Sequence, residues 1–387
     1  MSKAVLPTIV VTQFLCTSLW FAGNAVMPDL IQAMGVAPQF LAQATSAVQL
    51  GFVLGTLVFA LLALSDRFAA TKVYLGSAIV AAACNLGLLF TIIDPETIFV
   101  LRFGTGFFLA GIYPVGMKIA ADHFKENLGA VLGWLVGALV LGTAFPHLVK
   151  SLTHALPWQW VFASTSALAI LGGLLMFLFV KPNQPTAMPT SLKFTAFLDG
   201  FRLPAFRSAA FGYFGHMWEL YTFWAFVPWI LQAWNQFTGQ QLNVPLYSFI
   251  VIAIGFPACV ISGQLSVKFG AKMVASFALA SSGVCCLISP LFLQQSSSIL
   301  FLGFLFFWSM MVIADSPLFS SLVAKNAPIQ SRGSALTIVN CIGFTITIIS
   351  LFTIQQLSVL VAPRFLYLVL AIGPVLGLIG LHQKQQP

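Results

Sequence analysis

The chain has 387 residues, of which 59% are hydrophobic and only 7% are charged. With 17 Lys and Arg against 9 Asp and Glu, its formal net charge is +8. This composition excludes a soluble domain of ordinary size, because too few polar side chains are present to cover a globular surface. It is typical of a membrane protein with many spans.

Twelve apolar stretches follow one another along the chain, and each is long enough to cross a bilayer. A spanning helix needs about 20 mostly apolar residues, at about 1.5 Å per residue, to cover about 30 Å of hydrocarbon. The first stretch is expected to stay in the mature protein, because it is longer than the apolar part of a signal peptide and contains polar residues. The expected spans are 8–29, 42–64, 73–93, 97–121, 129–149, 159–180, 208–232, 246–267, 273–293, 297–323, 332–356 and 363–382.

A polar, proline-rich segment at residues 181–207 separates the sixth expected span from the seventh. The other connections are short, so this segment is the one convincing domain boundary in the sequence. The sequence therefore predicts an N-terminal bundle of six helices at 1–180, a linker at 181–207 and a C-terminal bundle of six helices at 208–387.

Basic residues fall mainly on one side of the expected membrane. An excess of Lys and Arg in short loops marks the cytoplasmic side, so both termini and the linker are expected to be cytoplasmic. Short loops without long extensions favour a bacterial inner membrane. No run of five or more basic residues occurs, so topology explains the positive charge better than nucleic-acid binding does. The expected cytoplasmic residues are Lys3, Arg67, Lys72, Lys125, Lys181, Lys193, Arg202, Arg207, Lys268, Lys272, Lys325, Arg332 and Lys384, against Lys150 and Arg364 on the other side.

Cysteine and histidine form no recognisable site in the sequence. All six cysteines fall inside expected spans, where they are predicted to be small packing residues, and no Cys-x-x-Cys or Cys/His cluster is present. The motifs of zinc peptidases, P-loop NTPases, serine hydrolases and dinucleotide-binding enzymes are also absent from the sequence. We therefore expect no enzyme activity, no cofactor, no metal and no ATP-driven pumping by this chain.

One seven-residue pattern occurs twice, and its two copies lie 201 residues apart. Each copy follows the second expected span of its half and precedes the third. Two related halves are typical of transporters built from repeated bundles. The sequence thus predicts an all-α membrane protein with twelve transmembrane helices in two pseudo-symmetric six-helix bundles. The copies are Leu64-Ser65-Asp66-Arg67-Phe68-Ala69-Ala70 and Leu265-Ser266-Val267-Lys268-Phe269-Gly270-Ala271.

This turn resembles the signature of the major facilitator superfamily, Gly-x-Leu-Ala/Ser-Asp-Arg-x-Gly-Arg-Arg/Lys. In the fourth span, Arg102 begins a stretch similar to the family's Arg-x-x-x-Gly element. The resemblance implies a gate in which Asp66, with Arg67 and Lys268, latches the two bundles in the outward-open state. The second copy has Val267 in place of the acid, so the expected latch depends on Asp66 alone.

The fifth span carries four glycines, mostly four residues apart, which are expected to let neighbouring helices approach closely. Drug antiporters of the family also have a Gly-Pro pair in this helix. Here three residues separate Gly142 from Pro146, so the antiporter motif is incomplete. The four glycines are Gly129, Gly133, Gly137 and Gly142.

Four ionisable residues lie deep within expected spans: Arg102 and Lys118 in the fourth, Glu219 in the seventh and Asp315 in the tenth. Each costs about 2.5–3.5 kcal/mol to insert, so each is a candidate functional group. The resemblance implies that spans 1, 4, 7 and 10 line a central cavity. Three arrangements remain open, in which the charges pair across the cavity, hold a zwitterionic solute, or bond within their own bundle. Lys118 also has Asp122 one turn later, the spacing of a simple ion pair.

Glu219 and Asp315 are the predicted proton-coupling residues, because a carboxyl group in hydrocarbon can exchange a proton near neutral pH. His216 precedes Glu219 by three residues and is expected on the same helix face. Pro317 is expected to kink the tenth span beside Asp315. The residues predicted to line the substrate cavity are Gln13, Trp20, Asn24, Arg102, Tyr113, Lys118, His216, Tyr221 and Trp224.

These features predict a secondary active transporter that moves a small organic solute by rocking two bundles about a midplane site. The expected solute is a polar or zwitterionic metabolite or an organic ion, and the expected coupling ion is the proton. Two alternatives remain open: efflux of drugs or of a secreted metallophore, and a transporter-like receptor that binds without transport. The expected partners are the small-molecule substrate, protons and the lipid bilayer, without nucleic acid, and the chain is expected to be a monomer.

Overall fold

The computed structural model describes residues 4–90, 94–124, 128–152, 157–181, 200–328 and 332–383. Within these ranges the regular structure is helical and no strand occurs. The chain divides into two compact units, Met1–Leu192 and Lys193–Pro387, each of which is described by itself. Most of the predicted linker lies outside the described residues, and its last four residues belong to a helix that begins at Pro204.

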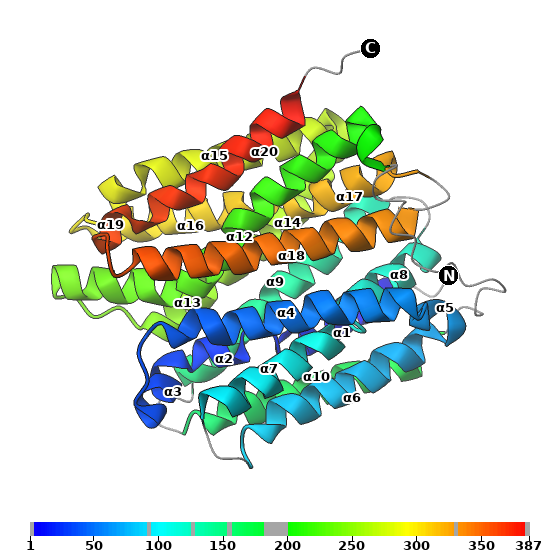
Figure 1. The fold of residues 1–387 in the computed structure, drawn as a ribbon, viewed down its shortest axis with the longest axis horizontal. Coiled ribbons are helices and arrows are strands. Elements are labelled where there is room, and N and C mark those ends of the chain that lie inside the picture. Colours follow the sequence, from blue (N-terminus) through cyan, green and yellow to red (C-terminus); the bar gives the residue numbers. More distant parts are fainter. Residues whose placement is uncertain are drawn as a thin grey trace. The chain divides into compact units, whose positions relative to one another are not determined.

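In the N-terminal unit, α4 packs along α7, α6 packs along α10, and α1 packs against both α9 and α10 (Figure 1). The first predicted span is not one helix but three, because the backbone leaves the helical hydrogen-bond pattern after Thr17. The helices are α1 Val5–Thr17, α2 Ala22–Ala25, α3 Met27–Met34, α4 Phe40–Leu61, α5 Leu64–Arg67, α6 Ala70–Gly87, α7 Pro95–Leu109, α8 Tyr113–His123, α9 Leu128–Leu152 and α10 Gln159–Phe179.

In the C-terminal unit, α12 packs along α20 and α18, and α15 packs along α16 (Figure 1). The long helix α12 has 35 residues and places its central part among its neighbours, where most of its side chains are buried. The helices are α12 Pro204–Thr238, α13 Val244–Ala253, α14 Gly255–Phe269, α15 Ala271–Phe292, α16 Ser298–Ala314, α17 Ser316–Asn326, α18 Arg332–Leu357, α19 Pro363–Leu366, the 3₁₀ helix η2 Tyr367–Ala371 and α20 Ile372–His382.

Described helices occupy each of the twelve predicted spans. By length and composition, nine helical segments of the described residues can cross a membrane. The remaining predicted spans, at 8–29, 73–93 and 208–232, correspond to broken or more polar helices. The nine segments are Phe40–Leu61, Pro95–His123, Gly129–Leu152, Gln159–Phe179, Val244–Phe269, Ala271–Phe292, Ser298–Asn326, Gly333–Leu357 and Pro363–His382.

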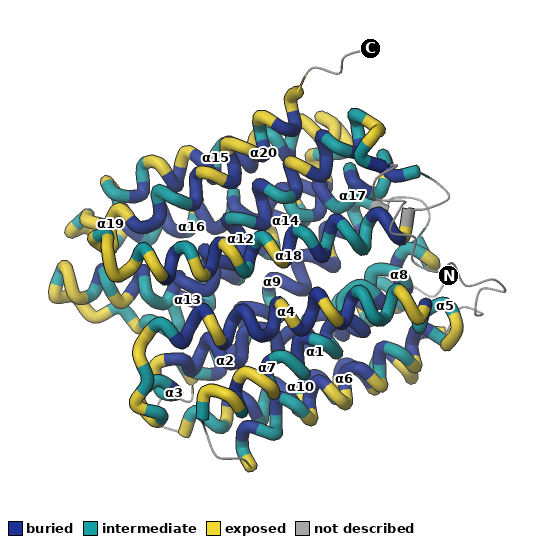
Figure 2. The backbone as a smooth tube through the Cα atoms, in the orientation of Figure 1, coloured by how far each residue is buried: buried dark blue, intermediate teal, exposed yellow. Residues whose placement is uncertain are grey.

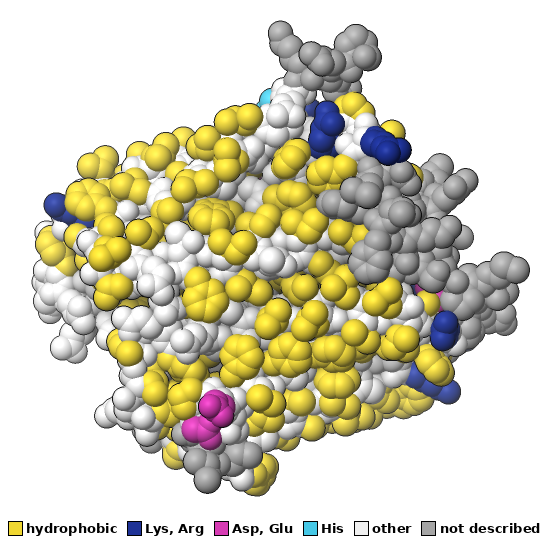
Figure 3. Space-filling view, in the orientation of Figure 1, with side chains coloured by type: hydrophobic (Ala, Val, Ile, Leu, Met, Phe, Trp, Pro, Cys, Tyr) yellow, Lys and Arg dark blue, Asp and Glu magenta, His cyan; other side chains and the backbone are white. Residues whose placement is uncertain are grey.

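The helices bury one side and leave large apolar side chains exposed on the other. Figure 2 shows buried and exposed residues alternating along single helices, and Figure 3 shows hydrophobic side chains over most of the visible helix surface. The visible Lys and Arg side chains lie near helix ends. An exposed apolar surface bounded by charges fits hydrocarbon between two aqueous faces.

Close packing of α4 against α7 depends on glycine. A Cβ atom on Gly106 would lie 2.0 Å from the Val48 carbonyl oxygen, and one on Gly51 would lie 2.0 Å from the Phe103 carbonyl oxygen. Gly142 of α9 makes a similar approach to α1, as predicted, whereas a Cβ on Gly129 would meet open space. The absence of side chains lets these backbones touch, as small residues do between membrane helices.

The fourth and the tenth predicted spans break beside a proline. Asp315 separates α16 from α17, and Pro317 is the second residue of α17, as the sequence predicted. In the N-terminal unit, α7 ends at Leu109 and α8 begins at Tyr113, with Pro114 as its second residue. Proline lacks an N–H group and suits the first turn of a helix, so each span restarts at its proline.

The helix α7 has a side-chain cap at its start. Asp94 accepts hydrogen bonds at 2.9 Å from the backbone N–H and 2.8 Å from the hydroxyl of Thr97. These bonds favour the carboxylate and lower the pKa of Asp94 below its usual value.

The two copies of the repeated turn differ in backbone. Directly before the first copy, Ala63 has a positive φ of 47° and caps the short helix α5. In the second copy, α14 continues to Phe269 and the turn falls on Gly270, with φ of 84°. Glycine adopts positive φ freely, whereas the left-handed helical conformation of Ala63 costs about 1–2 kcal/mol.

Candidate functional site

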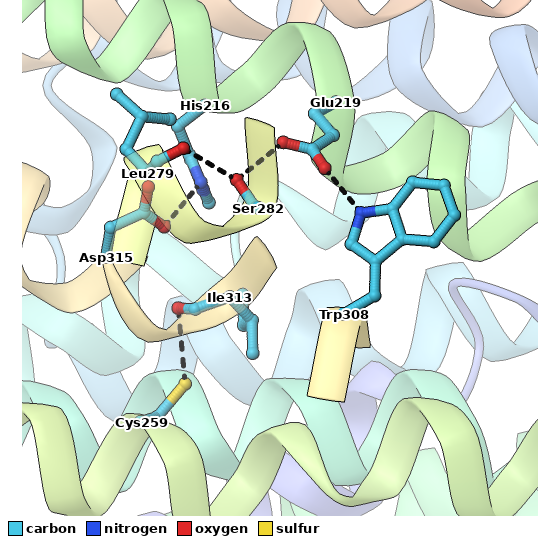
Figure 4. A network of polar contacts seen from close by, with 8 residues as sticks. All are labelled: His216, Glu219, Cys259, Leu279, Ser282, Trp308, Ile313 and Asp315. Atoms are coloured by element: carbon cyan, nitrogen blue, oxygen red, sulfur yellow. Dashed lines mark hydrogen bonds and ion pairs between the residues drawn. The ribbon is translucent and has the colours of Figure 1, made fainter. Parts of the chain in front are cut away.

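Glu219 of α12 is fully buried and is held by three donors from two other helices, two of which, Trp308 and Ser282, are drawn in Figure 4. Its Oε1 atom accepts from Trp308 Nε1 of α16 at 2.8 Å and from Cys286 Sγ of α15 at 3.1 Å. Its Oε2 atom accepts from Ser282 Oγ of α15 at 2.9 Å. Because an indole N–H can only donate, this arrangement satisfies a carboxylate at Oε1.

Ser282 can satisfy Glu219 in either protonation state. Its hydroxyl lies 2.9 Å from Glu219 Oε2 and 3.1 Å from the carbonyl oxygen of Leu279. A hydroxyl both donates and accepts, so Ser282 can donate to an ionised Glu219. It can equally accept from a protonated Glu219 while donating to Leu279. A proton can therefore enter or leave without stranding a buried polar atom.

The sequence identified Glu219 but not its partners. Trp308 was one aromatic residue among many, and Cys286 was predicted to be a packing residue only, whereas the structure makes it a donor to Glu219. The partners lie between 63 and 89 positions from Glu219 along the chain. Ser282 and Cys286 are one helical turn apart, which was a weak signal for a shared face.

His216 and Asp315 form a second buried pair in the same unit (Figure 4). His216 Nδ1 lies 2.8 Å from Asp315 Oδ1, which is an ion-pair distance when the imidazole is protonated. In the described part of the chain, His216 Nε2 and Asp315 Oδ2 have no hydrogen-bond partner. The sequence placed His216 beside Glu219, and the structure instead pairs it with the residue at the α16–α17 break.

Arg102 of α7 is 1% exposed. Among the described residues, its hydrogen bonds all go to partners in the N-terminal unit. Its Nη2 atom donates to the carbonyl oxygens of Leu19 at 3.0 Å and Trp20 at 2.6 Å, and its Nη1 atom donates to Asn85 Oδ1 at 2.9 Å. These carbonyls follow the C-terminal end of α1, where helix carbonyls lack partners and favour a cation. The sequence left three arrangements open for the buried charges. The contacts of Arg102 correspond to the third of them, in which a charged residue bonds within its own bundle.

Asn85 was not singled out by the sequence. It joins α6 to α10 by donating to Phe162 O at 3.2 Å, Thr165 Oγ1 at 3.1 Å and Ser166 Oγ at 2.9 Å. By accepting from Arg102 as well, its side chain uses both ends of the amide. A single asparagine within the apolar stretch predicted to span at 73–93 was the available signal.

The other predicted cavity residues of the N-terminal unit lie in different surroundings. Asn24 donates to Thr45 Oγ1 at 2.8 Å, and the Trp20 ring lies 4.8 Å from the Phe52 ring. Gln13 is fully buried, and neither its amide oxygen nor its amide nitrogen has a hydrogen-bond partner in the described residues. Tyr113 begins α8 and is half-buried.

Tyr221 and Trp224 of α12 are buried in an aromatic cluster of the C-terminal unit. Their ring centroids are 5.4 Å apart, and the Tyr221 ring lies 5.2 Å from that of Phe344. On the neighbouring part of the same helix, Phe223 packs 4.6 Å from Trp308. These contacts fix the helix face that carries Glu219.

Lys118 of α8 binds the predicted gate. Its ammonium group donates to the Asp66 carboxylate and to the Ser65 carbonyl oxygen. The sequence expected Asp122 as its partner, but the structure selects Asp66, because the α5 turn lies against α8. Lys118, which was predicted to line the cavity, thus contacts the predicted gate residue Asp66.

The other two predicted gate residues lie at the surface. Arg67 is exposed at the end of α5. Lys268 is also exposed, with its ammonium group 5.2 Å from the centre of the Phe269 ring.

No group of three or more His, Cys, Asp or Glu side chains that could hold a metal occurs among the described residues. The chemistry available in the C-terminal unit is proton exchange at two buried carboxyl groups, with neutral donors at Glu219 and an imidazole at Asp315. Asp315 lies at the break between α16 and α17. Glu219 lies on α12, which packs against α17.

Comparison with known proteins identifies the family. The family model of the Major Facilitator Superfamily matches residues 9–351. No curated protein matches the chain in sequence. Among solved structures, the proton:xylose symporter XylE bound to 6-bromo-6-deoxy-D-glucose is similar, with TM-score 0.73 and 15% identity, over 98% of this chain and 95% of that chain.

A second solved structure with the same fold is the human organic anion transporter MFSD10 (TETRAN). It has a TM-score of 0.77 and 15% identity, over 98% of this chain and 99% of that chain. At such identity both structures show the fold alone. Because the family model covers most of the sequence, this chain belongs to the major facilitator superfamily and is a multi-pass membrane transporter rather than an enzyme.

Proposed function

We propose that this secondary transporter couples the movement of a small polar solute to protons, and that Glu219 carries the coupled proton. The observation that carries the proposal is the position of Ser282, whose hydroxyl is within hydrogen-bond distance of both Glu219 Oε2 and Leu279 O. By rotating, the Ser282 hydroxyl can donate to an ionised Glu219 or accept from a protonated Glu219. A buried carboxyl group with this property can cycle between charged and neutral forms without unfolding its surroundings.

Asp315 and His216 are proposed as the second proton-binding pair. Both are fully buried, and one further nitrogen and one further oxygen of the pair have no partner in the described residues. Such unmade hydrogen bonds cost about 1–3 kcal/mol each, so the pair is poised to bind a proton or water when access opens. Its place at the α16–α17 break lets helix bending change that access.

For the solute, the contacts favour an uncharged polar molecule over a zwitterion or an organic ion. Arg102 and Lys118, the cations predicted to bind a charged solute, already have partners within the N-terminal unit. Neutral groups remain available, since the amides of Gln13 and Gln49 are buried without hydrogen-bond partners in the described residues. A xylose symporter with the same fold offers a precedent for such a solute.

In this proposal, helices within 1–180 and 208–387 form the two moving bodies, residues 181–207 link them, and Asp66, Arg67 and Lys268 belong to the gate. The membrane is proposed to be a bacterial inner membrane, with both termini cytoplasmic, on the distribution of basic residues.

The test uses purified protein in proteoliposomes that enclose a pH-sensitive dye. Pools of pentoses, hexoses and polyols, of amino acids and of organic anions are added with and without a pH gradient. We expect an uncharged polar pool to drive proton movement in the wild type. Glu219→Gln should abolish gradient-driven accumulation while retaining solute exchange, because its amide cannot cycle a proton.

Glu96→Gln is the matched control, because Glu96 is exposed at the start of α7. It should behave as the wild type does. Undiminished gradient-driven accumulation by the Glu219→Gln protein would remove Glu219 from proton coupling. Proton movement driven only by organic anions or amino acids would contradict the proposed solute class.

A further inference from the structure

An apolar groove runs along the outer face of the C-terminal unit between α15 and α16. It encloses about 540 Å³. Phe277 and Val284 of α15 are 67% and 53% exposed there, so the groove faces the surroundings of the protein. Its further lining includes Ala280, Ile288, Phe304 and Phe307.

A second hollow, of about 400 Å³, lies at the beginning of α15 and is lined in part by Lys272, Met273, Ser276 and His382. Ser276 Oγ lies 3.0 Å from His382 Nε2, which ties the start of α15 to the end of α20. Met273 of this hollow and Phe277 of the groove are four residues apart and lie on one helix face. The two hollows therefore follow one another along α15.

Together, the two hollows along α15 are about as long as one leaflet of a bilayer is thick. From Met273 to Val284 the helix rises about 16 Å at 1.5 Å per residue. The hydrocarbon core of a bilayer is about 30 Å thick, so this distance reaches its middle. An acyl chain that starts beside Lys272 would end near Val284.

The end of the unit that carries Lys272 is basic. The turn between α14 and α15 brings Lys268 to this end, and a hydrogen bond from Ser208 Oγ to Leu381 O at 2.6 Å brings the start of α12, with Arg207. Among described residues 200–328 and 332–383, the only acids are Glu219 and Asp315, and both are buried. No described carboxylate of the unit therefore offsets the positive charge at this end.

We propose that this groove binds one anionic phospholipid, with its phosphate against Lys272 and His382 and one acyl chain along α15 as far as Val284. Charge complementarity selects an anionic headgroup, because basic groups near a membrane surface attract anionic lipids. The exposed apolar stripe selects the acyl chain. This site is separate from the proposed proton and solute sites and does not depend on them.

The groove also forms the outer wall of the Glu219 site. Phe304 of its lining stacks on Phe292 at 4.5 Å and lies 5.5 Å from Trp308, the indole that donates to Glu219. Cys285, also in the lining, precedes the Glu219 donor Cys286. A bound acyl chain would thus pack one layer away from Glu219.

Native mass spectrometry of the detergent-purified full chain tests the site with added phosphatidylglycerol or phosphatidylcholine. We expect one phosphatidylglycerol to be retained in preference to phosphatidylcholine. Lys272→Gln should lower phosphatidylglycerol affinity by about fivefold, since each basic residue near the surface contributes about that factor. Ala280→Trp, which fills the groove, should lower the affinity for either lipid.

Two matched variants serve as controls. Lys325→Gln removes an exposed Lys from another helix end of this unit, and Leu287→Trp adds an indole on α15 outside the groove lining. Both should bind phosphatidylglycerol as the wild type does. Equal retention of the two lipids, an unchanged affinity in Lys272→Gln, or an equal loss in Lys325→Gln would overturn the proposal, because lipid would then bind only diffusely.

Discussion

At the scale of single residues, every deeply buried charge named by the sequence is engaged inside its own unit. Arg102 is held by carbonyl oxygens and an amide, and Glu219 is held by an indole, a thiol and a hydroxyl. His216 and Asp315 lie against each other. Hydrogen bonds to a charged group are worth about 1.5–3 kcal/mol each, so these contacts make the charges tolerable away from water.

Removing the Trp308 donor should destabilise the protein in a pH-dependent way. Trp308→Phe keeps an aromatic ring on Phe223 but deletes the N–H that donates to Glu219. We expect a loss of about 1.5–3 kcal/mol at alkaline pH, where the bond is made to a carboxylate, and a smaller loss at acid pH. Thermal unfolding in detergent at two pH values measures both.

Trp234→Phe provides the comparison, because Trp234 Nε1 donates at 2.8 Å to a neutral backbone oxygen, that of Gln295. It should cost about 0.5–1.5 kcal/mol at both pH values. If Trp308→Phe lost the same stability at acid and alkaline pH, the bond would not distinguish the two forms of Glu219.

At the scale of helices, glycine and proline decide how the elements meet. Gly51 and Gly106 let α4 and α7 touch at the backbone, while Pro317 restarts the tenth span beside Asp315. In hydrocarbon the helices gain nothing from excluding water between them, so close van der Waals contact carries their association. A site that depends on helix position is therefore sensitive to single methyl groups far from it.

Gly106→Ala should destabilise the N-terminal unit, and Gly76→Ala should not. The added Cβ would lie 2.0 Å from Val48 O in the first case and would meet nothing within 4 Å in the second. We expect a loss of about 1–3 kcal/mol or more for Gly106→Ala. Gly76→Ala should be neutral or stabilising by up to about 1 kcal/mol, because alanine favours the helix. Thermal unfolding of the two purified variants should separate them; equal melting temperatures would mean that α4 and α7 move apart at little cost.

At the scale of the whole molecule, the charged side chains of the described residues lie near helix ends or at a few buried sites. Hydrophobic side chains are spread over the visible surface, with Lys and Arg near helix ends (Figure 3). This distribution suits hydrocarbon between two aqueous faces, and the basic loops predict the orientation of the chain there.

The positive-inside rule predicts which loops a membrane-impermeant thiol reagent can reach. Lys325 and Gln240 are both exposed, and α12 and the α16–α17 span place them at opposite ends of the C-terminal unit. In intact bacterial cells, Gln240→Cys should be labelled, whereas Lys325→Cys should be labelled only after permeabilisation. The parent protein is the control for labelling of its six native cysteines. Labelling of Lys325→Cys in intact cells would reverse the proposed orientation.

The positions of the helices, the family and the buried charges could be predicted from the amino-acid sequence alone. A run of apolar residues long enough to cross a bilayer is a local property, so the predicted spans coincide with described helices. The repeated turn and Arg102 were sufficient for the family resemblance, and the family model confirms it. Glu219 and Asp315 stood out because an ionisable residue in hydrocarbon is costly wherever it points.

The contacts of each of these residues became known only from the packed helices. It replaced Asp122 by Asp66 as the partner of Lys118, and it placed His216 against Asp315. It also brought Trp308 to Glu219. These partners depend on how each helix is rotated about its axis and how closely its neighbours pack. Hydropathy and residue spacing in the sequence do not specify the rotation of one helix relative to another.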